Sequence, residues 1–269
     1  MKNPRCIATA SDANYFPGLL ALLNSLKKTN PQIPVTVLDG GLTREQVQSI
    51  SRHAEIVRKN PFIELENKGK FAYLGNTTLL KFEVSELDYE QVLYLDADMV
   101  VLENLDILFG VPEGKVGVVS EVNALKNMFR VQHRELVRNK INAEWNMPGF
   151  NAGLFCLRTE EHRDLKDRAL SLIGMFGEEV FSKTKCQQIL NLIFSGKTYN
   201  FPRRYNFSPF YDNEKEHPPA IIHYLTECKP WHTDYPEGHF YQAFRDNISE
   251  TDYPDITKID LEREKYIKK

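Results

Sequence analysis

Residues 1–59 alternate between short apolar runs and segments with helical periodicity. Three runs have the composition of strands, at residues 5–11, 33–41 and 54–59. Between the first two, apolar side chains recur at helical spacing from Phe16 to Leu26, and Pro17 suits the first helical turn. Thr43 and Gln46 have the spacing of a capping box, which predicts a second helix. A chain that begins β-α-β-α-β favours an α/β fold with a mostly parallel central sheet flanked by helices.

The apolar runs continue along the rest of the chain. Predicted strands cover residues 91–95, 115–120, 153–158 and 220–225. Residues 159–176 have a helical pattern, and a further short helix is predicted to end at Gly196. The segment 201–219 is rich in Pro, Asn, Tyr and Phe, and we expect it to form loops over a site. No domain boundary is evident, so we predict one domain over residues 1–245 and a charged C-terminal tail over residues 246–269.

Composition narrows the class of protein. A chain of 269 residues suffices for one large α/β domain, and 42% hydrophobic with 26% charged residues is typical of globular proteins. The net charge of −3 disfavours nucleic acid as a partner. The dispersed cysteines indicate neither a disulfide framework nor a zinc site, so we expect a reduced, cytoplasmic protein. No segment reaches membrane-spanning length, and the short basic end of the tail predicts at most weak peripheral contact with the inner face of the plasma membrane.

A pair of aspartates lies between two apolar runs in the segment QVLYLDADMVVLENLD, residues 91–106. Asp96 and Asp98 are two positions apart, so their side chains point the same way if the chain stays extended there. Ligands of open α/β sheets bind beyond the carboxyl ends of strands, and paired carboxylates there suit a divalent cation on a phosphate or diphosphate. The alternative is a surface turn with two solvated aspartates. The flanking apolar runs disfavour this alternative.

Two chemistries fit an apolar strand followed by Asp-x-Asp. In an aspartyl-nucleophile phosphohydrolase the first aspartate attacks phosphorus, but such a motif normally lies near the N-terminus and is followed by a further acidic loop. In metal-assisted transfer from a nucleotide-sugar the pair holds the cation. The position of the pair at residue 96 and the lack of a later acidic loop favour the second chemistry.

Four separated stretches resemble glycosyltransferase family 8, which includes glycogenin and bacterial lipopolysaccharide galactosyl- and glucosyltransferases. They are ATASDANYFPGLLALLNSL, LLKFEVSELDYEQVLYLDADMVVLENLDILF, GFNAGLFCLR and IIHYLTECKPW. Their order and spacing also match, and together they extend over most of the chain from Cys6 to Trp231. The resemblance implies a GT-A fold that binds a UDP-sugar.

The resemblance implies roles for the aspartate pair and for a late motif. The family's Asp-x-Asp holds Mn²⁺, with Mg²⁺ as the alternative, on the donor diphosphate; Asp96 and Asp98 match it, with Ala97 between them beside the nucleotide. His223 matches the first residue of the family's His-x-x-Gly-x-x-Lys-Pro-Trp motif, and is implied to be the third metal ligand. Lys229 of the same motif is implied to contact the diphosphate, where an ammonium stabilises leaving-group charge.

The first stretch is implied to bind the nucleotide. Asp12 would accept a hydrogen bond from the uracil N–H, Tyr15 would stack on the ring, Asn14 would reach the ribose, and Ala8 would lie close through its backbone. The alternative is a polar strand-to-helix turn in which Asp12 merely favours the helix start.

Residues on the sugar side are implied by two further stretches. Lys81 lies between apolar neighbours on an expected buried helix and would face the donor sugar and diphosphate. Residues 150–153 resemble the family's sugar-binding turn, in which Asn151 would bond a donor hydroxyl and Gly153 would permit close approach. Gln187 matches the catalytic region, so Lys81, Asn151 and Gln187 are the predicted catalytic residues.

Two positions depart from the family pattern. Cys186 stands where an aspartate is expected, and Thr226 replaces the glycine of the late motif. The resemblance as a whole still implies a retaining hexosyltransferase. We expect it to move galactose or glucose from a UDP-hexose to a glycan or glycolipid acceptor, in bacterial surface glycan or lipooligosaccharide synthesis. A catalytically weak or inactive UDP-sugar-binding protein of the same fold is the alternative.

Overall fold

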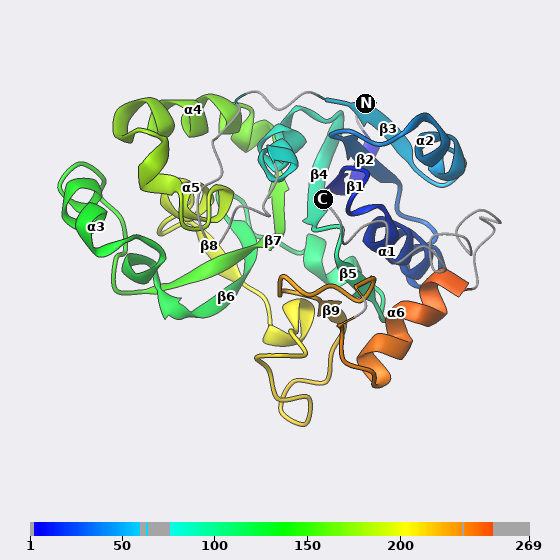
Figure 1. Cartoon of the computed structure of the whole chain (residues 1–269). Helices are drawn as coiled ribbons and strands as arrows, with labels where there is room; N and C mark the ends of the chain where they lie inside the picture. Colours follow the sequence, from blue (N-terminus) through cyan, green and yellow to red (C-terminus); the bar gives the residue numbers. More distant parts are fainter. Residues whose placement is uncertain (1–2, 60–62, 64–75, 233, 250–269) are drawn as a thin grey trace. The chain divides into compact units, whose positions relative to one another are not determined.

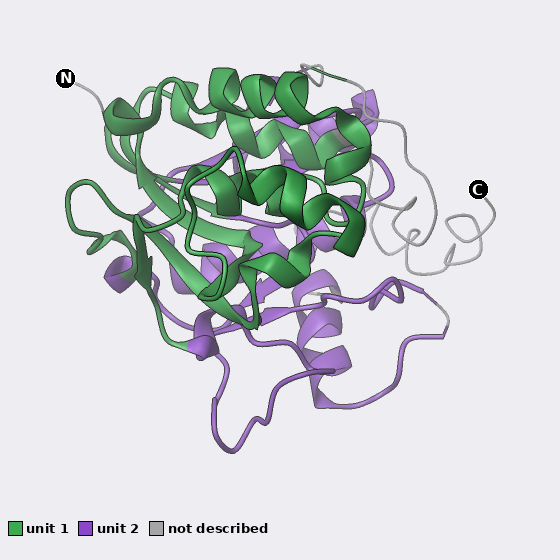
Figure 2. Cartoon of the chain, turned by 90° about the vertical axis from the view of Figure 1, so that its left-hand side faces the viewer, with its two compact units in different colours: residues 1–6, 60–94, 108–202 green, residues 7–59, 95–107, 203–269 purple. Residues whose placement is uncertain are grey.

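The computed structural model describes residues 3–59, 63, 76–232 and 234–249 (Figure 1). The chain forms two compact units, coloured separately in Figure 2. Unit 1 comprises residues 1–6, 60–94 and 108–202, and unit 2 comprises residues 7–59, 95–107 and 203–269. Each unit is therefore assembled from segments that are distant in sequence.

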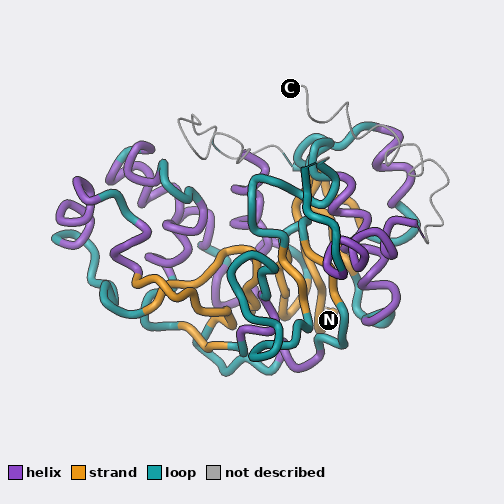
Figure 3. The backbone as a smooth tube through the Cα atoms, turned by 60° about the horizontal axis from the view of Figure 1, so that its bottom comes forward, coloured by secondary structure: helices purple, strands orange, loops and turns teal. Residues whose placement is uncertain are grey.

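The chain combines strands with helices, which are joined by loops (Figure 3). The strands are β1 Asn3–Ser11, β2 Val35–Asp39, β3 Glu55–Arg58, β4 Tyr89–Leu95, β5 Met99–Val101, β6 Val116–Ala124, β7 Pro148–Arg158, β8 Thr198–Asn200 and β9 Ile221–His223. The α-helices are α1 Phe16–Thr29, α2 Arg44–Ile50, α3 Val131–Arg138, α4 Leu165–Phe176, α5 Cys186–Ile193 and α6 His239–Ser249.

The β-α-β-α-β start that the sequence predicts is present, and from Ile7 onward it belongs to unit 2. Strands β3, β2 and β1 lie in that order and are parallel. The predicted capping box of α2 is present, because Thr43 Oγ1 accepts from Gln46 N while Gln46 Oε1 accepts from Thr43 N. Helix α1 packs on β5 and on α6 (Figure 1). Its buried face forms a core cluster with residues of β2, β5, β9 and α6, including Val37, Val100 and Ile222.

Unit 1 has β4, β7, β6 and β8 in that order. Strand β4 is buried on both faces over residues 91–95, as its apolar run predicts. Strand β6 is parallel to β8 but antiparallel to β7, so this part of the sheet departs from parallel order. Helix α5 packs on β7, and α4 packs on α5 (Figure 1). The fold is thus α/β with a mostly parallel central sheet flanked by helices, as predicted.

Several elements differ from their predictions. Residues 76–86, expected as a buried helix around Lys81, form a 3₁₀ helix. The helical pattern of residues 159–176 divides into a 3₁₀ turn, Thr159–His162, and α4. Residues 150–153, expected as a turn, lie inside strand β7 because that strand continues through them to Arg158. The sequence patterns do not predict α3, α6, β8 or β5.

The expected loops over residues 201–219 are present, apart from a 3₁₀ turn at Arg203–Asn206. Their aromatic residues have different environments: Tyr205 and Phe207 are buried, whereas Phe210 and Tyr211 are exposed. Within the described residues, no helix is both long and apolar enough to cross a membrane. Most of the predicted tail, residues 250–269, lies outside the described residues, and α6 extends into its first four positions.

Candidate functional site

The aspartate pair lies in the connection between β4 and β5, within unit 2. Strand β4 ends at Leu95 and β5 begins at Met99, so Asp96 and Asp98 flank a tight turn rather than an extended chain. Asp98 is buried, whereas the Asp96 side chain keeps 28% of its surface exposed. One carboxylate is therefore fixed inside the unit while the other faces outward.

His223 reaches this turn through a short antiparallel sheet. Strand β9 pairs with β5 in a register that sets His223 opposite Met99, and Tyr224 N donates to Asp98 O at 3.1 Å. The imidazole Nε2 lies 3.2 Å from Asp98 Oδ1 and 4.0 Å from Asp96 Oδ2. One atom from each of the three side chains lies within 4.8 Å of the others, so the structure brings together the three predicted metal ligands.

Asn206, which the sequence analysis did not identify, holds the imidazole from behind. Its Oδ1 lies 2.6 Å from His223 Nδ1, and both side chains are buried. An amide oxygen can only accept, so Nδ1 carries a proton, and Nε2 is the ring nitrogen that faces the aspartates. Metal-binding histidines commonly donate their other ring N–H in this way. No motif marks Asn206, because it lies 17 residues before His223 within a loop.

Lys229 contacts Asp98 from the other side. Its ammonium is buried and donates to Asp98 Oδ2 at 2.5 Å and to Tyr224 O at 2.7 Å. Burial opposes ionisation of Asp98 and is the largest influence on its pKa. The charges and hydrogen bonds of Lys229 and His223 outweigh that effect and hold the pKa well below its ordinary value, so Asp98 is an anion.

The donor set suits a hard divalent cation. Two carboxylates and one imidazole are the ligand types that Mn²⁺ and Mg²⁺ sites use, and the imidazole favours the transition metal. His223 Nε2 lies 3.2 Å from Asp98 Oδ1, within reach of the same cation. The residues present therefore fit the predicted metal.

The predicted nucleotide residues lie at the start of α1 in unit 2. Asp12 Oδ1 accepts from Asn14 N at 2.9 Å and from Tyr15 N at 3.2 Å, so this carboxylate shapes the turn before the helix. The Lys229 ammonium lies over the Tyr15 ring, 5.7 Å from the ring centroid, so Tyr15 lies beside the predicted metal ligands. Asn14 is exposed, and Ala8 is buried in β1. Their nucleotide contacts stay predictions.

Gly18 is a second residue that the sequence analysis did not identify. A Cβ at this position of α1 would lie 2.6 Å from Ala97 O and 2.7 Å from the Trp231 ring. The absence of a side chain therefore lets α1 approach the aspartate turn and the late Lys-Pro-Trp segment closely. Thr226 in that segment turns its hydroxyl to Cys228 O at 2.7 Å, where it stabilises the local loop.

The predicted sugar-side residues gather in unit 1. Lys81 is buried, donates from Nζ to Ala152 O at 3.0 Å, and lies 4.9 Å from the centroid of the Tyr94 ring. Gln187 Oε1 accepts from Asn151 Nδ2 at 3.3 Å and from Ala152 N at 3.4 Å. Two of the side chains predicted to be catalytic, Lys81 and Gln187, thus converge on the backbone of Ala152, next to the third, Asn151.

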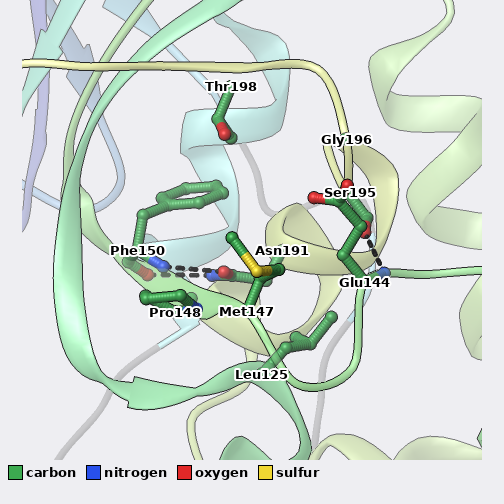
Figure 4. A pocket seen from close by; sticks show the side chains of 10 residues that line it. Leu125, Glu144, Met147, Pro148, Phe150, Asn191, Ser195, Gly196 and Thr198 are labelled. Atoms are coloured by element: carbon green, nitrogen blue, oxygen red, sulfur yellow. Dashed lines mark hydrogen bonds between the residues drawn. The ribbon is translucent and has the colours of Figure 1, made fainter.

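Asn191 on α5 fixes the same strand one residue earlier. Its carboxamide donates to Phe150 O and accepts from Phe150 N, both at 2.8 Å (Figure 4). The pocket in Figure 4 has about 20 Å³ of space, enough for one water molecule, and is lined by Asn191, Glu144, Ser195 and neighbouring residues. Cys186 is buried at the first position of α5, consistent with a packing role.

Solved structures share this fold. A crystal structure of an active-site variant of LgtC matches with a TM-score of 0.77 at 22% identity, covering 95% of this chain and 99% of that chain. The galactosyltransferase LgtC in complex with donor and acceptor sugar analogues matches with a TM-score of 0.69 at 22% identity, covering 95% of each chain. The fold is therefore that of the GT-A glycosyltransferases.

Sequence comparison gives the family. The profile "Glycosyl transferase family 8" matches residues 6–235, so the chain belongs to this family of glycosyltransferases. A lipopolysaccharide 1,2-glucosyltransferase of Escherichia coli K12 is 26% identical over 272 residues, covering 90% of this chain and 77% of that protein. The glycosyltransferase GlyE of Streptococcus pneumoniae is 20% identical over 236 residues and covers 84% of this chain. The chain spans only 57% of GlyE's length.

Proposed function

We propose that this protein is a retaining, Mn²⁺-dependent hexosyltransferase that moves galactose or glucose from a UDP-hexose to a hydroxyl of a glycan or glycolipid acceptor. The observation that carries the proposal is the convergence of Asp96, Asp98 and His223 in a member of glycosyl transferase family 8. The similarity to a lipopolysaccharide glucosyltransferase supports an acceptor in bacterial surface glycan synthesis. We further propose a cytoplasmic location, with at most weak attachment to the inner membrane face.

The residues of unit 2 would hold the UDP part of the donor. Asp96, Asp98 and His223 would bind the cation, which when bound neutralises charge on the donor diphosphate. Lys229 would add a fixed positive charge to the leaving diphosphate, because its ammonium is already buried beside Asp98. Tyr15, close to that ammonium, would stack on the uracil, with Asp12, Asn14, Ala8 and Ala97 as the further predicted contacts.

The residues of unit 1 would hold the donor sugar. Asn151 and Gln187 present amide groups that can bond sugar hydroxyls, with Gly153 allowing close approach, and Lys81 holds the intervening backbone through Ala152 O. A double-displacement reaction needs a carboxylate nucleophile at the anomeric carbon. The Gln187 amide is a poor nucleophile, and its Oε1 already accepts from the β7 strand.

Retention would then follow from front-face attack. The acceptor oxygen bonds to the anomeric carbon on the face from which UDP departs. The bond from that carbon to the phosphate oxygen breaks, and the acceptor hydroxyl proton passes to the leaving diphosphate. The Lys229 ammonium would stabilise the departing charge, in addition to any cation held by Asp96, Asp98 and His223. A Gln187→Ala variant that keeps its transfer rate would exclude an essential role for that side chain.

A thermal-shift panel of UDP-sugars, with and without Mn²⁺, tests the proposal. Saturating donor at 100 times its dissociation constant stabilises the folded state by about 2.7 kcal/mol. We expect the shift for UDP-galactose or UDP-glucose to require Mn²⁺ and to be lost in Asp96→Asn and Asp98→Asn. The exposed Glu237→Gln substitution, which removes one acid from the same unit, should keep it.

Turnover distinguishes the enzyme from a binding protein. Release of UDP from the stabilising UDP-hexose in the presence of Mn²⁺ supports the transferase. Tight binding without hydrolysis or transfer would instead favour the inactive UDP-sugar-binding protein, the alternative suggested by the departures from the family pattern at Cys186 and Thr226. Hydrolysis of an aryl phosphate that Asp96→Asn abolishes would point to the phosphohydrolase.

A further inference from the structure

Three cations gather in unit 1 between α3 and the loop that precedes α5. This cation cluster consists of Arg130, Arg134 and Lys183. Lys183 Nζ donates to Asn127 O at 2.5 Å, and Arg134 Nε donates to Phe129 O at 3.2 Å. Two positive side chains are thus anchored on carbonyls that lie two residues apart, and Arg130 follows directly in the chain.

The anchors of the cation cluster are rigid. Phe129 is fully buried, and its ring packs against Trp145 at 5.7 Å and Phe181 at 6.4 Å between centroids. On the other side, the buried Gln188 of α5 accepts from Lys183 N at 3.2 Å and from Thr184 N at 2.8 Å. The positions of Lys183 and Arg134 are therefore set by the core of the unit.

The charges of the cation cluster are not balanced by acids. Burial lowers the pKa of Lys183, and the charges of Arg134 and Arg130 lower it further, while no carboxylate raises it. In the part of the chain that the structure describes, no carboxylate forms an ion pair with any of the three side chains. The adjacent α3 begins without a side-chain cap and without an acid in its first turn. Like charges held together in this way favour the binding of an anion.

We propose that Arg130, Arg134 and Lys183 form a binding site for a phosphate monoester carried by a sugar. Two guanidinium groups with free N–H donors and one ammonium match the oxygens of a dianion better than those of a single carboxylate. The loop that carries Lys183 leads directly into α5, the helix of Gln187 and Asn191. The site would hold a phosphorylated acceptor glycan, a part of the inference that rests on the proposed function.

A flat anionic membrane fits the cation cluster less well. Glu135 directly follows Arg134 on α3 and is exposed. An anionic membrane against this face would approach that carboxylate as well as the arginines, which weakens its attraction. A compact phosphate group reaches the three cations without covering the rest of the helix.

Calorimetric titration of the full chain tests the site. Inorganic phosphate and glucose 6-phosphate are titrated without metal or nucleotide, so that the result does not depend on the donor site. We expect both to bind, unmodified glucose not to bind, and each of Lys183→Gln and Arg134→Gln to weaken binding roughly tenfold. Arg163→Gln removes an equal charge from the same unit, where Arg163 pairs with Glu160, and should bind like the wild type.

The outcomes separate this proposal from its rivals. Equal phosphate affinity in all variants, or none in the wild type, would overturn it even if the donor panel succeeds. Binding to phosphatidylglycerol vesicles that Lys183→Gln and Arg134→Gln weaken, without affinity for glucose 6-phosphate, would also overturn the proposal. It would instead favour a membrane contact. If Lys183→Gln does not fold, as judged by circular dichroism, the exposed Arg130→Gln gives the same comparison.

Discussion

Asn206 has a role at the scale of a single hydrogen bond. Its carboxamide fixes which nitrogen of His223 faces the two aspartates. Asp96, Asp98 and His223 are predicted as metal ligands from the sequence because each belongs to a motif with fixed spacing, and the structure brings them together. The sequence could not identify Asn206, since one more asparagine in an Asn-rich loop has no pattern, and only the fold places it behind the imidazole.

Replacing Asn206 by leucine is expected to weaken Mn²⁺ binding by about 10- to 100-fold, because outer partners of metal-binding histidines have effects of that size. Electron paramagnetic resonance of free Mn²⁺ during a titration measures the change. Asn206→Asp keeps an acceptor for Nδ1 and should lose less. Asn213→Leu, in the same loop, is the control. An unchanged affinity in Asn206→Leu would show that the hydrogen bond does not orient the ring for metal.

His162 gives a prediction about acid stability. Its ring is buried, its two nitrogens have no hydrogen-bond partner among the described residues, and it packs edge-on against Phe194 at 5.2 Å. Burial, followed by the charge of Arg168, lowers its pKa from 6.5 to about 4. Between these values the unfolded chain binds a proton that the folded chain does not, so the free energy of unfolding falls as the pH falls.

Urea unfolding at pH 7.5 and pH 5 measures this effect. Because His162 takes up a proton in the unfolded chain but not in the folded one, it should account for about 2 kcal/mol of the free energy of unfolding lost between pH 7.5 and pH 5. His162→Phe, which can keep the contact with Phe194, should remove that part of the loss. The same substitution at the loop residue His217 should leave the loss in place, and an identical pH dependence in His162→Phe and wild type would refute the assignment.

The elements around the site show where sequence patterns are informative. Helices α1 and α2 were predicted because amphipathic spacing and a capping box are local signals. Strand β5 was missed because its three residues, Met99–Val101, continue an apolar run without any boundary. Its partner β9 is 120 residues further on, so the antiparallel pairing that delivers His223 is a product of tertiary contacts.

Substitution by alanine is expected to have opposite effects on stability at two helical glycines, Gly18 on α1 and Gly174 on α4. Gly18→Ala introduces a Cβ 2.6 Å from Ala97 O, so the helix must shift away from the turn. We expect a loss of about 1–3 kcal/mol, as for other overpacked sites, together with weaker Mn²⁺ binding. Gly174→Ala on α4 meets nothing within 4 Å and should stabilise the protein by about 1 kcal/mol. Chemical denaturation measures both, and equal effects would contradict the close approach of α1.

We expect the two units to be protected from hydrogen exchange by different parts of the donor. The predicted metal and nucleotide residues belong to unit 2, whereas Lys81, Asn151 and Gln187 belong to unit 1. Hydrogen exchange followed by mass spectrometry should show that UDP with Mn²⁺ protects residues 11–19, 95–101 and 221–231. Protection of residues 150–153 and 186–191 should appear only with a complete UDP-hexose. Protection of unit 1 by UDP alone would contradict this division.

The interleaving of the two units has a consequence for biosynthesis. Unit 1 has all its segments once residue 202 has been made, whereas unit 2 needs the final segment that begins at Arg203. The carboxylates at positions 96 and 98 therefore leave the ribosome long before the imidazole and the ammonium that balance them. During translation the three predicted metal ligands are therefore incomplete until His223 has been made. A chain that ends just after residue 202 would contain every segment of unit 1 but lack His223, the third predicted metal ligand.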